Sequence, residues 1–184
     1  MSTADKQFDI RDYLREYLFP HFLCPGCGHG IALRALLWGI DDLGIDKDRL
    51  AFVSGIGCSG RLGAYIDANT FHVTHGRPLA SATGLKLARP DLEVIVITGD
   101  GDCLAIGGNH LIHACRRNLN ITCMMLNNEV YGMTGGRYRR LPATIATPRR
   151  RPTVTMSPCS TLARWRRPPA PVWWDARSRC KRPV

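Results

Sequence analysis

The sequence predicts an α/β domain in which a parallel sheet is flanked by helices. Over the first 136 residues, short apolar segments alternate with segments of helical spacing, which is typical of strands joined by crossover helices. The clearest strand is LEVIVITGDG, residues 92–101, which is β-branched from Val94 to Thr98 and ends among glycines. A helix over roughly residues 103–117 and a strand at residues 121–128 follow, which completes a β-α-β unit.

The elements before this unit are predicted from their spacing. Residues 6–19 carry apolar side chains at helical intervals and predict a helix that Pro20 ends. A glycine-rich turn at residues 24–30 precedes an amphipathic helix over residues 31–45, which Gly44 interrupts. The other expected elements are a buried strand with its exit loop at residues 50–57, a strand and loop at 71–76, and a small-residue helix at 77–88.

The bulk properties exclude several classes of protein. With 184 residues the chain is long enough for one domain with a hydrophobic core. No run of about 18 apolar residues is present, and the first 19 residues lack the apolar core of a secretion signal, so we expect a cytoplasmic protein outside the membrane. In that compartment the eight cysteines are expected to be ligands, redox groups or buried small side chains.

Two kinds of sequence meet near Gly136. Residues 137–184 carry 13 of the 25 basic residues and one of the 15 acidic residues, whereas all 18 glycines lie before them. We therefore expect a folded domain over residues 1–136 and a disordered or loosely packed tail over residues 137–184. Two interpretations of the tail stay open: a basic arm that binds nucleic acid, or a changed reading frame, which we favour because the two parts meet without a linker.

Polar residues follow two consecutive strands at a spacing that predicts a cation site. The motif GDG at residues 99–101 ends the clearest strand, and Asn127 and Asn128 end the next one. Because the carboxyl ends of parallel strands share one edge of a sheet, Asp100 and Asn128 are expected to face a common crevice. Their oxygens suit Mg²⁺, which takes its other positions from diphosphate oxygens and water, and the glycines let a phosphate approach the backbone.

The second candidate site consists of Cys24, Cys27 and Cys58. Thiolates are soft ligands that suit zinc or an iron–sulfur cluster. The CxxC pair lies on a glycine-rich turn, and Cys58 lies in a Gly-Cys-Ser-Gly segment that we expect to be a flexible loop able to supply a third sulfur. From the residues alone, a zinc site, a dithiol redox pair and an iron–sulfur site all stay open. Three further cysteines are expected to pack in the core: Cys103, Cys115 and Cys123.

Taken together, these motifs resemble one known family. GDG, then 25 residues, then NN is the diphosphate-and-magnesium motif of thiamine diphosphate enzymes. The stretches CPGCGHG, GIGCSGR, HGRPLASATGLKLARPDL and NNEVYGMTGG closely resemble the β subunit of 2-oxoacid:ferredoxin oxidoreductases. The resemblance covers about residues 6–136, and the motifs occur in the family's order.

The resemblance implies roles for individual residues. Asp100, Asn128 and the main-chain carbonyl of Val130 would hold Mg²⁺. Cys24, Cys27 and Cys58 would hold a [4Fe–4S] cluster near the thiamine. The family's fourth cysteine ligand lies far downstream, and because the sequence around Cys159 and Cys180 is unlike the family's, we assign the ligand role to neither. The residues expected to line the thiamine diphosphate site are Ile56, Gly57, Cys58, Ser59, His75, Gly101, Asp102, Gly132 and Met133.

The implied activity is the oxidative decarboxylation of a 2-oxoacid with coenzyme A to an acyl-CoA and CO₂, with electrons passing through the cluster to ferredoxin. The substrate would be 2-oxoglutarate or pyruvate, and the resemblance favours 2-oxoglutarate slightly. The family places the acidic group that activates the aminopyrimidine on a partner α subunit, and no side chain of this chain is an obvious general base. We therefore expect an enzyme subunit of a heterodimer that is inactive without its partner.

Two other functions stay open at this stage. The basic tail could make the chain a nucleic-acid-binding protein, which we consider the weaker interpretation. The chain could also be a thiamine-dependent decarboxylase without electron transfer, although the three cysteines argue against that reading.

Overall fold

The computed structural model describes residues 8–135, 137–138 and 153–158. Its elements are, in order, the 3₁₀ segments η1 (Ile10–Tyr13) and η2 (Glu16–Leu18), α1 (His29–Asp42), η3 (Lys47–Arg49), β1 (Leu50–Ser54), α2 (Cys58–Tyr65), β2 (Asn69–His72), α3 (Pro78–Ala88), β3 (Glu93–Gly99), the π-helical turn η4 (Gly101–Ile106), α4 (Gly108–Arg117), β4 (Ile121–Asn127), β5 (Val130–Tyr131), β6 (Arg137–Tyr138) and β7 (Thr153–Pro158).

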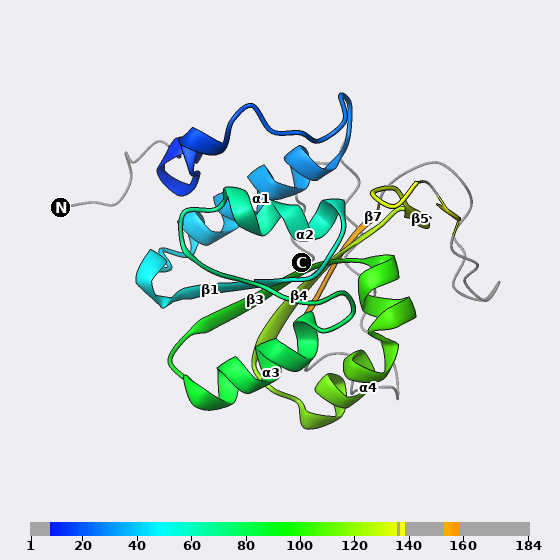
Figure 1. Ribbon diagram of the computed structural model, residues 1–184. Coiled ribbons are helices and arrows are strands. Elements are labelled where there is room, and N and C mark those ends of the chain that lie inside the picture. The colour runs from blue at the N-terminus through cyan, green and yellow to red at the C-terminus, as the bar shows by residue number, and fades with distance from the viewer. Residues whose placement is uncertain (1–7, 136, 139–152, 159–184) are drawn as a thin grey trace, which may run out of the picture.

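The centre of the molecule is a sheet whose four parallel strands lie in the order β2, β1, β3, β4. Strand β7 pairs antiparallel with β4 at one edge. Helices α1 and α2 lie on one side of the sheet, and α3 and α4 lie on the other (Figure 1). The predicted α/β class, a parallel sheet flanked by helices, is therefore confirmed.

The side chains of β3 explain why both faces of the sheet are covered. Ile95 and Ile97 belong to the core cluster beneath α1 and α2, whereas Val94 and Val96 belong to the cluster beneath α3 and α4. Successive side chains of a strand point to opposite faces, so a continuous apolar run must be buried on both sides. The β-branched run in the sequence thus fixes β3 as a central strand.

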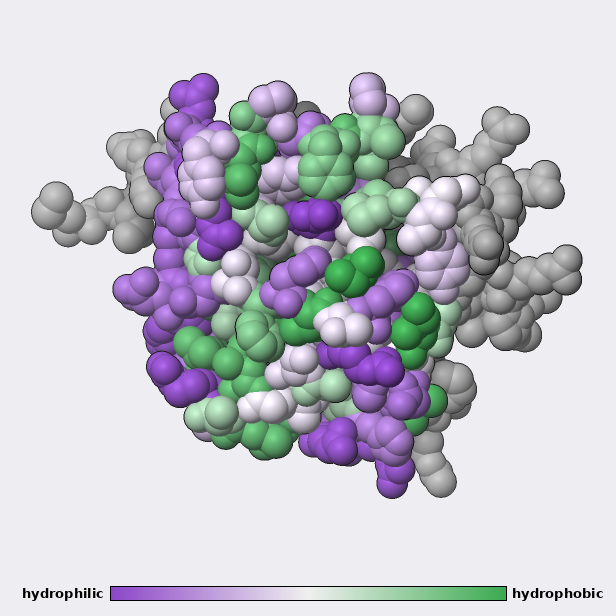
Figure 2. All heavy atoms as spheres, in the orientation of Figure 1, coloured by the Kyte–Doolittle hydropathy of each residue, from purple (hydrophilic) through white to green (hydrophobic). Residues whose placement is uncertain are grey.

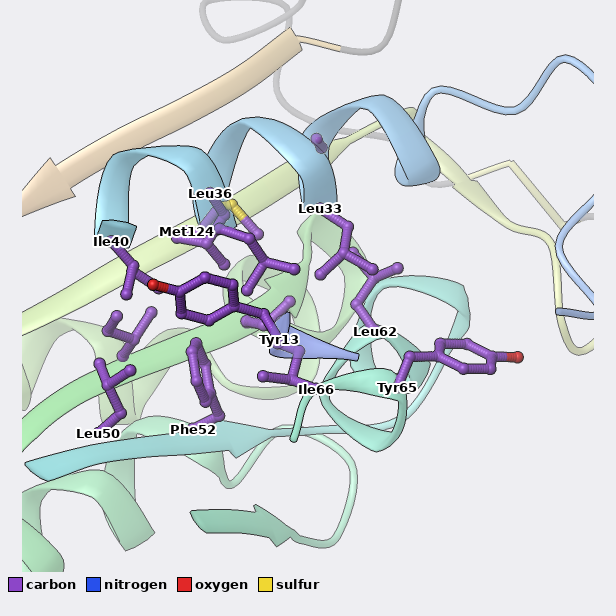
Figure 3. Close-up of a cluster of buried hydrophobic side chains, with 14 of the residues drawn as sticks. Tyr13, Leu33, Leu36, Ile40, Leu50, Phe52, Leu62, Tyr65, Ile66 and Met124 are labelled. Atoms are coloured by element: carbon purple, nitrogen blue, oxygen red, sulfur yellow. The ribbon is translucent and has the colours of Figure 1, made fainter. Parts of the chain in front are cut away.

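The larger core cluster lies between α1, α2 and the sheet. Leu36 and Ile40 point from α1 toward the side of the cluster that holds Leu50 and Phe52 of β1, and Leu33 lies above Leu62 of α2 (Figure 3). Phe52 is fully buried. Burying one such side chain stabilises the fold by about 1.5–3 kcal/mol. This packing fixes α1 on the sheet, and with it the cysteine turn from which the helix begins.

The four predicted strands are confirmed as β1, β2, β3 and β4, and two predicted helices are confirmed as α1 and α3. The helix expected over residues 103–117 is instead divided into η4 and α4 at Gly107. A Cβ at Gly107 would lie 2.5 Å from the Asp102 carbonyl oxygen and 2.9 Å from that of Gly76. Only a glycine therefore fits where these backbone segments meet.

The helix predicted over residues 6–19 is wrong, because η1 and η2 are separated by extended backbone. Leu14 forms an isolated antiparallel bridge with Ile66, and the Arg15 N–H donates to the Tyr65 carbonyl at 2.9 Å. The Arg15 guanidinium also donates to the Ala64 carbonyl in the last turn of α2 and to the Ala68 carbonyl just before β2. These tertiary contacts outweigh the helical spacing of the segment.

The flexible loop expected around Cys58 is also wrong, since Cys58 begins α2. Small residues let this helix lie close to the end of β1. A Cβ at Gly60 would overlap the Gly55 carbonyl oxygen, and one at Gly63 would lie 3.0 Å from the Ser54 hydroxyl oxygen. Close packing, rather than an amphipathic pattern, places this helix.

Part of the basic tail contributes to the fold. Strand β6 pairs with β5, and β7 pairs with β4. The other residues of the tail that we expected to be disordered, 139–152 and 159–184, lie outside the described residues, as do Cys159 and Cys180.

The surface in Figure 2 intersperses hydrophobic and hydrophilic residues. None of the helices within the described residues combines the length and the apolar character needed to cross a membrane.

Tyr13 joins the N-terminal segment to α1 and gives a testable pH dependence. Its hydroxyl donates to the Asp41 carboxylate at 2.7 Å, and burial, followed by this hydrogen bond and the Asp41 charge, raises the pKa of Tyr13 to about 12. A phenol in the unfolded chain ionises near a pKa of about 10. The stabilisation from Tyr13 is therefore complete below pH 10 and is lost as the pH rises through about 12.

We expect Tyr13→Phe to lose less stability than the wild type between about pH 10 and pH 12. Urea unfolding followed by circular dichroism across this range measures the difference. Parallel losses in the two proteins would show that Tyr13 does not titrate as described.

Candidate functional site

A pocket opens at the carboxyl ends of the parallel strands. Its lining comes from the segments that follow β1, β2, β3 and β4 and from the start of α1. All the residues expected beside the thiamine or its metal ion line this one pocket: Ile56, Gly57, Cys58, Ser59, His75, Asp100, Gly101, Asp102, Asn128, Val130, Gly132 and Met133. The pocket also takes Gly99 of the GDG motif, and three residues that sequence reasoning missed: His29, Tyr131 and Thr134.

Asp100 and Asn128 lie together at adjoining strand ends. Gly99 pairs with Leu126 in the β3–β4 register, so the two strands end at nearly the same level. Asp100 is only 2% exposed, and the Asn128 N–H points at its Oδ1 atom over 3.5 Å. Both residues thus line one pocket, at the adjoining strand ends where their spacing predicts a common crevice.

The backbone after Asn128 turns sharply into the pocket. The Asn128 Oδ1 atom accepts the Val130 N–H at 3.1 Å, and Glu129 between them adopts a left-handed φ of 59°. This conformation costs a residue other than glycine about 1–2 kcal/mol. An amide oxygen has two lone pairs, so Asn128 can accept this hydrogen bond and still face a cation. A carboxylate, an amide oxygen and a main-chain carbonyl form a donor set that fits Mg²⁺.

Asp102 is buried in the wall of the pocket and accepts hydrogen bonds from three neighbouring segments. The Thr98 hydroxyl donates to Oδ2 at 2.6 Å, and the Gly76 N–H donates to Oδ1 at 2.6 Å. The Ile56 N–H reaches Oδ1 over 3.4 Å, and His75 Nδ1 forms a short ion-pair contact with the same oxygen. Its carboxylate is therefore bound to protein groups on several sides.

Tyr131 forms another part of the wall. Its ring packs edge-on against the His75 ring, with centroids 6.2 Å apart and planes at 82°. A Cβ at Gly101 would overlap the Tyr131 ring, so glycine is needed at this position for the aromatic ring to approach the backbone.

The three candidate ligand cysteines lie near one another beside the pocket. Burial raises the pKa of the Cys58 thiol, and the nearby Cys27 and Cys24 raise it further. Cys24 is exposed, whereas Cys27 and Cys58 are half-buried. Within the ranges that the structure describes, no three His, Cys, Asp or Glu side chains are arranged to hold a metal ion. The three thiols are thus neighbours beside the pocket.

His29 connects the cysteine turn to the pocket. Its Nδ1 atom lies 2.8 Å from Cys27 Sγ, and its Nε2 atom lies 3.1 Å from Ser59 Oγ. Burial lowers the pKa of His29. The sequence offers no sign of this bridge, because its three members come from two segments that meet only when α1 packs beside α2.

The remaining cysteines of the domain are buried as expected. Cys103, Cys115 and Cys123 belong to the core cluster beneath α3 and α4. Their packing role is therefore confirmed.

Comparison with known proteins gives a consistent result. Residues 55–160 match the family model described as thiamine pyrophosphate enzyme, C-terminal TPP binding domain, a range that extends past Gly136. The chain is 56% identical over 124 residues to the 2-oxoglutarate synthase subunit KorB of Methanothermobacter thermautotrophicus, which covers 67% of this chain and 43% of that protein. It is 53% identical over 115 residues to the 2-oxoglutarate oxidoreductase subunit KorB of Mycobacterium tuberculosis, which covers 62% of this chain and 31% of that protein. The chain thus spans less than half the length of these curated relatives.

A solved structure is similar in both fold and sequence. It is a 2-oxoglutarate:ferredoxin oxidoreductase from Magnetococcus marinus with 2-oxoglutarate, coenzyme A and succinyl-CoA bound. The TM-score is 0.69 and the sequence identity is 42%, over 74% of this chain and 46% of that chain.

The bridge through His29 can be tested by its effect on stability. His29→Ala leaves the buried Ser59 hydroxyl without its histidine partner, which we expect to cost about 1–3 kcal/mol. The matched control is His113→Ala, since His113 is exposed on α4 and should change stability by less than about 0.5 kcal/mol. Urea unfolding at neutral pH measures both variants, and equal stabilities would contradict the bridge.

Proposed function

The chain belongs to the thiamine pyrophosphate enzymes, and we propose that within this family it is the β subunit of a 2-oxoacid:ferredoxin oxidoreductase. The proposed reaction converts a 2-oxoacid and coenzyme A to an acyl-CoA and CO₂ while two electrons pass to ferredoxin. Relatives that are 50–56% identical over 115–125 aligned residues carry names of this class.

The observation that carries the proposal is the meeting of Asp100 and Asn128 in one pocket at the ends of β3 and β4. The crevice beyond the carboxyl ends of parallel strands is where open α/β sheets bind their ligands. Asp100 is buried there, and a buried carboxylate is stabilised by an adjacent cation. This arrangement supports a site for Mg²⁺ with a diphosphate.

Each group of pocket residues has a distinct proposed task. Asp100, Asn128 and the Val130 carbonyl would hold Mg²⁺, and the metal would hold the diphosphate. The first residues of α2 line the pocket, so their N–H groups are available to a phosphate. The other thiamine-site residues of the sequence prediction would enclose the cofactor: Ile56, Gly57, Cys58, Ser59, His75, Gly101, Asp102, Gly132 and Met133.

Bound thiamine diphosphate supplies the electron sink that the loss of CO₂ from a 2-oxoacid requires. The protein's contribution is to position the cofactor, to exclude water from it and to set the charge around it. We assign the acidic group that activates the aminopyrimidine to a partner α subunit, because the described residues offer only Asp100 and Asp102 as pocket carboxylates. Both carboxylates already have other tasks, one toward the cation and one toward the protein.

The proposed substrate is 2-oxoglutarate. The similar Magnetococcus marinus enzyme is described with 2-oxoglutarate, coenzyme A and succinyl-CoA bound, and the two KorB relatives above are named for 2-oxoglutarate. Coenzyme A and ferredoxin are the further partners that this reaction needs.

Cys24, Cys27 and Cys58 are the proposed ligands of an iron–sulfur cluster. Their support is the soft chemistry of thiolates and their proximity beside the pocket. The three thiols are one fewer than the four of a [4Fe–4S] site.

The cation site can be tested with Asp100→Asn. Loss of the carboxylate charge should weaken Mg²⁺-dependent binding of thiamine diphosphate by about 10- to 100-fold, since a charged ligand is replaced by a neutral one. Isothermal titration calorimetry of the chain with its partner subunit measures the affinity. Asp91→Asn is the matched control, because Asp91 is exposed and pairs with Arg89 away from the pocket. Unchanged affinity and unchanged Mg²⁺ dependence in Asp100→Asn would exclude the proposed site.

The cluster ligands can be tested by anaerobic reconstitution with iron and sulfide. We expect broad visible absorption and bound iron in the wild type, and loss of both in Cys24→Ser and Cys58→Ser. Cys115→Ala, which removes a thiol of the opposite core cluster, should retain them. Equal iron content in all four proteins would rule out these cysteines as ligands.

A further inference from the structure

We propose that Asp102 is a positioning residue that fixes the tautomer of His75, so that Nδ1 carries the proton and Nε2 is the ring nitrogen left for the pocket. The sequence resemblance places Asp102 among the residues that line the cofactor. The structure supports a different task for its carboxylate, which is directed at the protein. The inference deepens the proposed function, because it concerns how the same pocket is prepared for thiamine diphosphate.

The first support is the burial of Asp102 and the number of donors around it. Its side chain is about 1% exposed, and removing a carboxylate from water is unfavourable unless hydrogen bonds replace the water. The Thr98 hydroxyl and the Gly76 N–H each donate to it at 2.6 Å, and the Ile56 N–H and His75 add further contacts. These donors use both oxygens, so the carboxylate is held in one orientation.

The second support is the origin of these donors. Thr98 lies in β3, Ile56 follows β1, and His75 and Gly76 follow β2. Asp102 therefore fastens together three adjacent strand ends around the pocket. A single carboxylate sets both the spacing of these segments and the direction of the His75 ring.

The third support is the close approach of Gly55 to this carboxylate. A Cβ at Gly55 would overlap both carboxylate oxygens of Asp102. Asp102 itself lies in the π-helical turn η4, a wide turn of a kind found at functional sites. The missing side chain of Gly55 therefore leaves room for the Asp102 carboxylate, and Asp102 approaches this space from a π-helical turn.

The consequence for His75 follows from the two nitrogens of an imidazole. A neutral ring carries one proton, and the hydrogen bond made by one nitrogen decides the state of the other. Asp102 can only accept at Nδ1, so Nδ1 must hold the proton. Nε2 then accepts a hydrogen bond in the neutral ring and donates one in the protonated ring. Tyr131 packs edge-on against this ring and limits its rotation.

The test is the ¹⁵N NMR signature of the histidine ring in the full chain without cofactor. We expect wild-type His75 to show the pattern of the Nδ1–H tautomer at mildly alkaline pH, and His75→Asn identifies its signals by their loss. Asp102→Ala should abolish this pattern. Thr98→Val removes another hydrogen bond to the same carboxylate, and it should preserve the pattern.

Two results would overturn the proposal. One is a wild-type His75 in the Nε2–H tautomer. The other is an unchanged Nδ1–H pattern in Asp102→Ala. A purely structural role for Asp102 would alter stability in both Asp102→Ala and Thr98→Val without a specific change in the tautomer of His75.

A double-mutant cycle connects the tautomer to the cofactor. Asp102→Ala should weaken thiamine diphosphate binding by about tenfold, but by less than about threefold in a His75→Ala background, since contacting residues that act together are not additive. Equal losses in both backgrounds would contradict action through His75. A wild-type complex that binds no thiamine diphosphate would refute the proposed function, while the tautomer measurement would still decide the role of Asp102.

Discussion

The pocket depends on the parallel pairing of β3 with its two neighbours. Parallel pairing brings the carboxyl ends of β1, β2, β3 and β4 to one edge of the sheet, and the register of β3 with β4 makes their ends nearly level. Asp100 and Asn128, which are far apart in the chain, therefore become neighbours. The apolar run of β3 and the helices on both faces maintain this pairing.

The carboxylates of Asp100 and Asp102 are only two residues apart in the sequence, but they lie in different environments at this edge of the sheet. Asp102 points into the protein, where donors from three segments offset the cost of burial. Asp100 points into the pocket beside Asn128. One acidic residue thus organises the walls, and the other is the ligand that we propose for the cation. Asp102 lies within the π-helical turn η4, whereas Asp100 directly precedes it.

The sequence predicts the structural features that depend on local patterns of residues. The β-branched residues of β3 and the polar residues that follow it identify a parallel strand and its ligand-bearing end. Two predictions are wrong, the helix over residues 6–19 and the loop around Cys58, and both fail because of tertiary contacts. The Arg15 N–H donates to the end of α2 instead of continuing a helix, and Gly60 lets a short helix form where a loop was expected. The bridge through His29 and the contacts of Asp102 join segments that are distant in sequence, so no spacing could reveal them.

The central claim is that Asp100 and Asn128 together hold a cation that carries a diphosphate. The most direct measurement is a crystal structure of the chain with its partner subunit, Mn²⁺ and thiamine diphosphate, in which anomalous scattering locates the metal. The account predicts one manganese ion within bonding distance of the Asp100 carboxylate, the Asn128 amide oxygen and the diphosphate. A manganese ion bound elsewhere, with the diphosphate away from the ends of β3 and β4, would contradict it.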